Sequence, residues 1–306
     1  LKHVRALMLN YLKNIVVKFS WSMIFFCLRC ILLLPRVMWH KIGRSLGCLF
    51  FVLMKKRQAV IKKNIELCFP HIGKSKQNEL QKHNIQELGI GALDFFMLRF
   101  KSNSYIAKQS NIIGFDLLSK AVEAQQGVII FLPHTSTLCI AIGVLSQLLP
   151  IKLVYRPFKH EALRSILSKL SRKIGMKLIA QRDVKGIIKA LNNKGNIVIL
   201  PDHDMGRAGA SFASFFGIKA ATTVSIFKLA KSTGAKIISV YSYRLNSGKV
   251  CLEFSNGLNS YCNSSHDDAA TAMNEYLETN IKRFPSQYYW PHRRFKTRPH
   301  NEENIY

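Results

Sequence analysis

The sequence predicts an α/β fold with a largely parallel central sheet flanked by helices, preceded by an N-terminal membrane-anchoring helix. Three observations lead to this prediction. From residue 127 onward, short apolar runs of strand length alternate with segments of about 10 to 14 residues that have helical character. Residues 15–54 are mostly apolar. The chain has 306 residues, of which 48% are hydrophobic, which suffices for a packed core.

The alternation of strands and helices predicts right-handed crossover connections, and therefore strands that run mostly in one direction. The expected strands span residues 127–132, 151–155, 177–180, 196–200, 235–241 and 249–254. The expected helices span residues 55–70, 75–100, 161–174, 183–193 and 220–232. Ser75 can cap the second of these helices, and Gly234 follows the last one as a C-terminal cap.

Within the apolar N-terminal stretch, residues 19–39 form the best single span for a bilayer that requires about 20 apolar residues. Trp21 and Trp39 near its two ends suit the membrane interface. Arg29 lies near the middle, so either it pairs within the protein or the helix lies in the interface. Basic residues are denser after the span than before it, which places the following domain on the cytoplasmic side. We therefore divide the chain into a membrane anchor region, 1–54, and a globular domain, 55–306.

The net charge of +28 arises from 45 Lys and Arg residues against 17 Asp and Glu residues. This excess favours an anionic partner, such as nucleic acid, an acidic protein or the anionic face of a bilayer, unless it reflects a biased genomic composition. No recognised nucleic-acid motif accompanies the charge, and we expect no nucleic-acid partner. The seven cysteines lack the spacing of a disulfide framework, which favours a reducing compartment.

The first candidate for catalysis is His134, which follows a predicted buried strand and precedes a predicted helix. Ligands of open α/β sheets bind at this edge, and a histidine there can act as a general base. The alternative is a capped loop histidine without a chemical role. Arg156 also follows a predicted strand, where it can meet a phosphate or a developing oxyanion.

A second candidate segment is Asp202-His203-Asp204, which follows the strand at 196–200. Capping of the turn by Asp202 is the ordinary alternative. No further ligand group has convincing spacing, so we expect no metal. The aromatic residues of 212–217 can line a pocket for an acyl chain or fill the core. Near the C-terminus, aromatics lie beside Arg293 and Arg294, a combination that suits a membrane interface, a phosphorylated ligand or a nucleic-acid strand.

In this order, the segments resemble the late acyltransferases of lipid A biosynthesis, the lauroyl- and myristoyltransferases of the lysophospholipid acyltransferase superfamily. The resemblance covers nearly the whole chain. Five segments carry it: Asn64-Ile-Glu-Leu-Cys-Phe-Pro70, Val154-Tyr-Arg-Pro157, Leu200-Pro-Asp-His-Asp-Met-Gly206, Phe215-Phe-Gly217 with Ala220-Ala-Thr222, and His292-Arg-Arg-Phe-Lys-Thr-Arg-Pro299.

The resemblance implies an O-acyltransferase at the bacterial inner membrane, with its catalytic domain on the cytoplasmic side. It implies acyl carrier protein as the acyl donor, a hydroxyacyl chain of the Kdo-lipid A precursor as the acceptor, and no cofactor. Both partners are anionic, which agrees with the basic chain. His134 would be the general base and Arg156 would hold the oxyanion or a lipid phosphate, while Asp202, Asp204, Arg293 and Arg294 would bind substrate.

One residue departs from the family's pattern, in which a carboxylate follows the catalytic histidine after four residues. Cys139 occupies that place. Three outcomes follow: a slow enzyme, a rescue by Asp202 or Asp204 if their loop folds over His134, or an inactive lipid-binding relative. A thiolate at Cys139, favoured by a helix N-terminus, is a further alternative.

Overall fold

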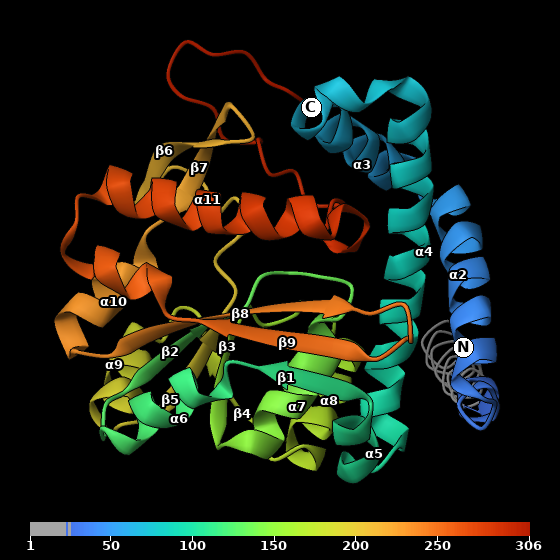
Figure 1. Ribbon diagram of the computed structural model, residues 1–306, viewed down its shortest axis with the longest axis horizontal. Helices are drawn as coiled ribbons and strands as arrows, with labels where there is room; N and C mark the ends of the chain where they lie inside the picture. Colours follow the sequence, from blue (N-terminus) through green and yellow to red (C-terminus); the bar gives the residue numbers. More distant parts are fainter. Residues whose placement is uncertain (1–22, 24–25) are drawn as a thin grey trace, which may run out of the picture.

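The computed structural model describes Met23 and residues 26–306, and its centre is a seven-stranded sheet (Figure 1). The strand order is β1-β9-β8-β2-β5-β3-β4. The strands are β1 (Ser110–Ile113), β2 (Val128–Phe131), β3 (Ile151–Tyr155), β4 (Lys177–Ala180), β5 (Asn196–Ile199), β8 (Lys236–Arg244) and β9 (Val250–Ser255). Strands β8, β2, β5, β3 and β4 are mutually parallel, and β9 is antiparallel to β8. The predicted largely parallel sheet is therefore confirmed.

The described helices surround this sheet. They are α2 (Arg36–Leu53), α3 (Lys55–Cys68), α4 (Gly73–Phe100), α5 (Asn103–Lys108), α6 (Phe115–Glu123), α7 (Leu138–Leu148), α8 (Glu161–Lys173), α9 (Val184–Asn192), α10 (Ser225–Thr233) and α11 (His266–Arg283). Figure 1 shows α11 over one face of the sheet, α7 and α8 under the other, and the long α4 along one end with α2 outside it.

The prediction of a helix over residues 220–232 was wrong at its start. Residues 218–223 form β7 (Ile218–Thr223), which pairs antiparallel with β6 (Ala210–Phe215), and α10 begins only at Ser225. Phe216 and Gly217, which join the two strands, both have positive φ, as a tight hairpin turn requires. Pairing with β6 thus overrides the helical propensity of Ala220 and Ala221.

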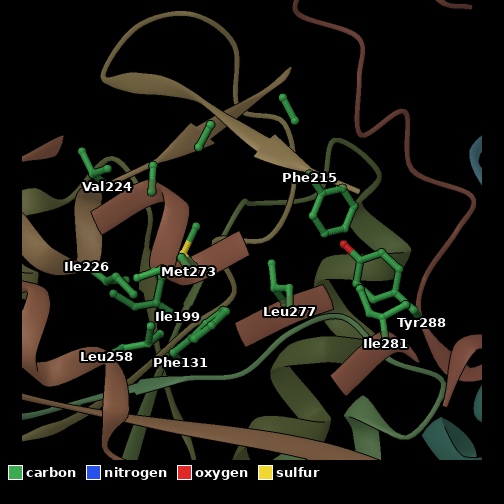
Figure 2. Packing of buried hydrophobic residues seen from close by; sticks show 14 of the residues in the cluster. Phe131, Ile199, Phe215, Val224, Ile226, Leu258, Met273, Leu277, Ile281 and Tyr288 are labelled. Carbon is green, nitrogen blue, oxygen red and sulfur yellow. The ribbon is translucent and has the colours of Figure 1, made fainter. Parts of the chain in front are cut away.

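Alternating side chains of β2 serve two separate hydrophobic cores. Ile129 and Phe131 point to the face covered by α9, α10 and α11, whereas Val128 and Ile130 point to the face covered by α6, α7 and α8. In Figure 2, Phe131 lies opposite Met273, with Leu277 and Ile281 farther along α11. This two-sided burial explains why the strand reads as a continuous apolar run.

The N-terminal region differs from the predicted single span over residues 19–39. Residues 19–22 and 24–25 of that span lie outside the described residues. The described part is helical over 26–31, turns at 32–34, and α2 starts after Pro35. Trp39 is fully buried in the protein core, so it does not mark a membrane interface. Among the described residues, no single helix has the length and apolar composition to cross a bilayer; α2 and α3, bent by 105°, meet these criteria only together.

Helix α2 has one face on the protein and one face exposed. Its inner face meets α4 so closely that a Cβ at Gly89 would lie 2.1 Å from the carbonyl oxygen of Gly43. Large apolar side chains on its outer face are exposed, among them Leu46, Leu49, Phe50 and Leu53. The crossing of α2 and α4 therefore depends on glycine, and its other side leaves an apolar surface without a described partner.

Two buried asparagines, one on α3 and one on α4, hold the C-terminal segment that follows α11 (residues 284–306). Asn64 of α3 donates 2.8 Å hydrogen bonds to the carbonyls of Trp290 and His292, and Asn84 of α4 donates likewise to Ser286 and Tyr288. Tyr306 donates to the Asn64 side-chain oxygen, which brings the C-terminus to α3 (Figure 1). The carbonyls of the segment thus find their partners in side chains rather than in a strand.

Replacing Asn64 with alanine should leave two carbonyls without donors, and we expect the free energy of unfolding to fall by about 2 to 4 kcal/mol. Urea denaturation followed by circular dichroism measures this difference. Asn192→Ala, at an exposed site at the end of α9, is the matched control and should change stability by less than about 0.5 kcal/mol. Equal effects of the two substitutions would contradict a clamping role for Asn64.

Candidate active site

Three adjacent parallel strands bring the main candidate residues to one edge of the sheet. His134 follows β2, Asp202 and His203 follow β5, and Arg156 follows β3. The strands lie side by side in the order β2-β5-β3 with all carboxyl ends at one edge. The sheet order, which the sequence alone does not determine, makes neighbours of segments that are 68 residues apart.

His134 and Asp202 form a paired arrangement through two hydrogen bonds. The Nδ1 atom of His134 lies 2.7 Å from Oδ1 of Asp202, and the backbone N–H of His134 donates to Oδ2 at 3.0 Å. Because a carboxylate accepts hydrogen bonds, this geometry places the proton on Nδ1 and leaves the lone pair on Nε2. The imidazole side chain is 24% exposed, whereas that of Asp202 is completely buried.

The Asp202 carboxylate is stabilised in its ionised form. Burial by itself raises the pKa of Asp202, but the charge of His134 and the hydrogen bonds from it outweigh burial and lower this pKa below its usual value. A buried, ionised carboxylate behind an imidazole both orients the ring and stabilises the imidazolium when it forms. The pair therefore has the arrangement of a general base, His134, supported by the carboxylate of Asp202.

The loop that carries His134 is fixed from several sides. Tyr289 donates its backbone N–H to the carbonyl of His134, and Ser136 donates to the carbonyl of Gln287. The hydroxyls of Thr135 and Thr137 share hydrogen bonds of 2.9 Å with Ser242 of β8. These contacts hold the backbone of His134 independently of its ring.

A cavity of about 440 Å³ opens beside His134, with Arg156 on its wall. His203, His292, Leu138 and Phe158 also line it. A neighbouring cavity of about 620 Å³ shares four of its lining residues, Val154, Gln181, Leu200 and Met205. Most of its other lining residues belong to α9 and α10, among them the apolar Ile187, Ile188 and Leu229 and the polar Lys228.

Cys139 does not take the place of the missing carboxylate. It is the second residue of α7, where Leu138 and Ile142 line the cavity and Cys139 packs against the core. Burial, with a contribution from Asp94, raises the pKa of the Cys139 thiol to about 12. The thiol therefore stays protonated at neutral pH, which disfavours the alternative of a thiolate at Cys139.

Three residues expected to bind substrate have contacts of a different kind. Asp204 is buried and accepts hydrogen bonds from the backbone of Gly206 and from the backbone and hydroxyl of Thr297. Arg294 is also buried and donates to the carbonyl of Ala221 and the hydroxyl of Thr222. Both carboxylate oxygens of Asp204 and both terminal nitrogens of Arg294 form hydrogen bonds inside the protein, so the two side chains hold the C-terminal segment in place, although Nε of Arg294 has no partner among the described residues. The third residue, Asp202, is buried and forms hydrogen bonds with His134.

Arg293 and Arg156 remain accessible. Arg293 is exposed, and its guanidinium lies over the ring of Tyr306, 5.7 Å from the centroid. Arg156 is exposed on the cavity wall and makes no ion pair with any described residue. Of the two, only Arg156 shares a cavity with His134.

Two further histidines complete the site: His203, which belongs to the second candidate segment of the sequence analysis, and His292, to which the sequence analysis gave no role. The ring of His203 stacks on that of His134 with centroids 3.7 Å apart, and the ring of His292 stacks on the other face of His203 at 3.9 Å. Burial lowers the pKa of His203 to about 3 and that of His292 to about 4. The available signal in the sequence was that His203 lies next to Asp202 and His292 next to Arg293, in two of the segments that carry the family resemblance.

The atoms of His134, Asp202 and His203 lie close enough to suggest a metal site, since their ligand atoms are within 4.8 Å of one another. However, Nδ1 of His134 and Oδ1 of Asp202 already contact each other at 2.7 Å. In addition, the rings of His134 and His203 are parallel within 8°, so their in-plane lone pairs do not converge on one ion. The geometry is that of a hydrogen-bonded pair with a stacked neighbour.

Comparison with known proteins gives one consistent result. The model of the family described as "Bacterial lipid A biosynthesis acyltransferase" matches residues 10–297. The chain is 30% identical over 278 residues to the lipid A biosynthesis lauroyltransferase of Escherichia coli K12, covering 89% of this chain and 90% of that protein. It is 29% identical over 267 residues to the lipid A biosynthesis palmitoleoyltransferase of the same strain, covering 87% of each.

A lipid A biosynthesis acyltransferase of Haemophilus influenzae is 30% identical over 276 residues, with 89% of this chain and 88% of that protein covered. The resemblance inferred from the five segments is thereby confirmed. The chain belongs to the bacterial lipid A biosynthesis acyltransferase family and is an acyltransferase of lipid A biosynthesis.

Proposed function

We propose that this protein transfers a fatty acyl chain from the thioester of acyl carrier protein to a hydroxyacyl chain of the Kdo-lipid A precursor. The observation that carries the proposal is the pairing of His134 with Asp202 on the wall of a cavity. Nε2 of His134 takes the proton of the acceptor hydroxyl, and the oxygen attacks the thioester carbonyl carbon. The C–S bond then breaks, and the imidazolium returns the proton to the departing thiolate.

In this mechanism Asp202 supplies the carboxylate that Cys139 does not. It keeps the Nδ1 proton in place and offsets the charge of the imidazolium. Arg156, on the same cavity wall, would hold the oxyanion of the tetrahedral intermediate or a lipid phosphate. The alternative of an inactive lipid-binding relative rested on the loss of the carboxylate, and the position of Asp202 argues against it.

The two adjoining cavities suit a fatty acyl donor. The apolar cavity of about 620 Å³ is within the size range of ligand pockets, about 300 to 1,000 Å³, and it begins where the His134 cavity ends. We propose that the acyl chain of the donor lies between α9 and α10. Three basic residues line the two cavities and favour an anionic donor and acceptor: Arg156, Arg182 and Lys228.

We further propose that residues 1–54 attach the protein to the inner membrane, with the domain of residues 55–306 on the cytoplasmic side. The exposed apolar face of α2 ends in Leu53, and the basic residues Lys55, Lys56 and Arg57 follow at once. Apolar side chains in the acyl region with Lys and Arg at the headgroups are typical of contact with an anionic bilayer.

Substitution of the pair tests the mechanism. We expect His134→Ala and Asp202→Asn each to lower kcat by about 10²- to 10⁴-fold, because the first removes the base and the second removes the group that orients it. The assay combines purified protein, acylated carrier protein and lipid A precursor, with the product identified by mass spectrometry. His300→Ala and Asp267→Asn, at exposed sites, serve as matched controls, and thermal unfolding checks that each variant is folded.

Substitutions of Cys139 test whether Asp202, rather than a carboxylate at residue 139 as in the family's pattern, supports His134. Cys139→Ala should keep activity within about threefold of the parent, since no hydrogen bond among the described residues joins the thiol to His134. Cys139→Glu should not increase the rate, because its carboxylate would be buried near Asp94. A large gain in rate with Cys139→Glu, or full activity of Asp202→Asn, would overturn the role given to Asp202. Tight lipid binding by the parent without any product would favour the inactive relative.

A bulky side chain at the far wall of the apolar cavity should shorten the preferred acyl chain. We expect Leu229→Trp and Ile188→Trp to shift the products toward chains shorter by two or more carbons, as donors of several lengths compete in one reaction. Val122→Trp, exposed on α6 at a distance from both cavities, should leave the product distribution unchanged. An unaltered distribution in all three variants would show that the acyl chain lies elsewhere.

Negative charges introduced on the apolar face of α2 test the membrane contact. Leu49→Glu combined with Phe50→Glu should release the protein from liposomes that contain anionic lipid, because charged side chains do not enter the acyl region without a large free-energy cost. Flotation on a density gradient measures the bound fraction. Leu163→Glu, at an exposed apolar site on α8, is the control. Continued flotation of the double variant would rule out the proposed contact.

A further inference from the structure

The three stacked imidazoles are built into the site from separate parts of the chain. His134 follows β2, His203 follows β5 and His292 belongs to the C-terminal segment. The rings of His134 and His203 are parallel within 8°, and those of His203 and His292 within 9°. His203 is therefore enclosed between two flat rings, one of which is the base of the proposed reaction.

We propose that His203 is a positioning residue whose flat, uncharged ring holds the plane of the His134 imidazole. The inference rests on the proposed function, in which Nε2 of His134 is the base. The hydrogen bond to Asp202 fixes only one atom of the His134 ring, Nδ1, and by itself leaves the ring free to tilt about that point. A ring stacked over one face removes this tilt, so that Nε2 keeps a single direction toward the cavity.

The contacts of His203 favour a role for its face rather than for its nitrogen atoms. Its Nε2 atom is buried and has no hydrogen-bond partner among the described residues. Stacked faces offer no route for a proton between the rings, because the nitrogen lone pairs and N–H bonds lie in the ring planes. What His203 presents to His134 is thus a flat surface that also keeps water from that side.

The outer ring, His292, is itself held. Its Nε2 atom accepts the backbone N–H of Asp204 at 2.9 Å, which places its own proton on Nδ1 and requires the neutral form. Asn64 holds the carbonyl of the same residue. Burial lowers the pKa of both His203 and His292, so neither ring is charged at neutral pH to repel the imidazolium of His134. The charged groups that act on the rings of His203 and His292 are the carboxylates of Asp202 and Asp204 and the guanidinium of Arg294. Arg294 is engaged with Thr222 and Asn274.

The test compares side chains at residue 203 that differ in flatness. His203→Leu removes the flat ring, and His203→Phe restores it without nitrogen. We expect His203→Leu to lower kcat by about 10-fold or more, with KM for donor and acceptor within about twofold of the parent. His203→Phe should recover most of the lost kcat. His203→Met, which is flexible and fills irregular space, should behave as His203→Leu does and replaces it if that variant does not fold.

A second readout does not depend on substrate. The Nδ1 proton shared between His134 and Asp202 should give a strongly downfield signal in the proton NMR spectrum, assigned by its loss in Asp202→Asn. We expect this signal in the parent and in His203→Phe, and its broadening or loss in His203→Leu and His203→Met. Thermal unfolding midpoints measured on the same samples exclude general loss of structure.

Three outcomes would overturn the inference. These are parental kcat in His203→Leu, equal loss of kcat in His203→Leu and His203→Phe, and loss of kcat in His203→Leu with the NMR signal intact. The failure of the proposed function is recognisable separately, because in that case the parent gives no product or His134→Ala is as active as the parent.

Discussion

The hydrogen-bonded pair of His134 and Asp202 is the interaction on which the site depends. It exists because β2 and β5 are neighbouring parallel strands that end at the same edge of the sheet, so the residues that follow them meet. The apolar side chains of the two strands fill cores on both faces, and the position of the pair is therefore set by the most deeply buried part of the molecule. Rigid strands place such groups more precisely than free loops do.

The C-terminal segment completes the site although it is far from it in sequence. It pairs with the His134 loop through Gln287 and Tyr289, and it supplies the third ring of the stack, His292. Its own carbonyls are held by Asn64 and Asn84 on two helices. Several polar residues that resemble ligand-binding groups in the sequence, Asp204 and Arg294 in particular, have this supporting task.

The sequence predicted the sheet and the parts of the site more successfully than it predicted their contacts. Strands β3 and β4 were predicted at their observed bounds, because apolar runs between turn residues identify buried strands directly. The hairpin of β6 and β7 was missed, since Ala220 and Ala221 favour a helix when read locally and become a strand only through their partners. The break of the N-terminal helix at Pro35 was likewise passed over in favour of overall hydropathy. His134 and Arg156 were identified because both follow strands, whereas the partner of His134 depends on strand order, which no local pattern contains.

The replacement of a carboxylate by Cys139 then has a physical interpretation. An imidazole base needs one acceptor within reach of Nδ1, and the chemistry does not depend on which strand or helix delivers it. Asp202 meets this need from the end of β5, and a second carboxylate at residue 139 would be buried near Asp94. Like charges in such surroundings repel strongly. A neutral thiol at residue 139 thus fits a site in which the carboxylate of Asp202 already serves the imidazole.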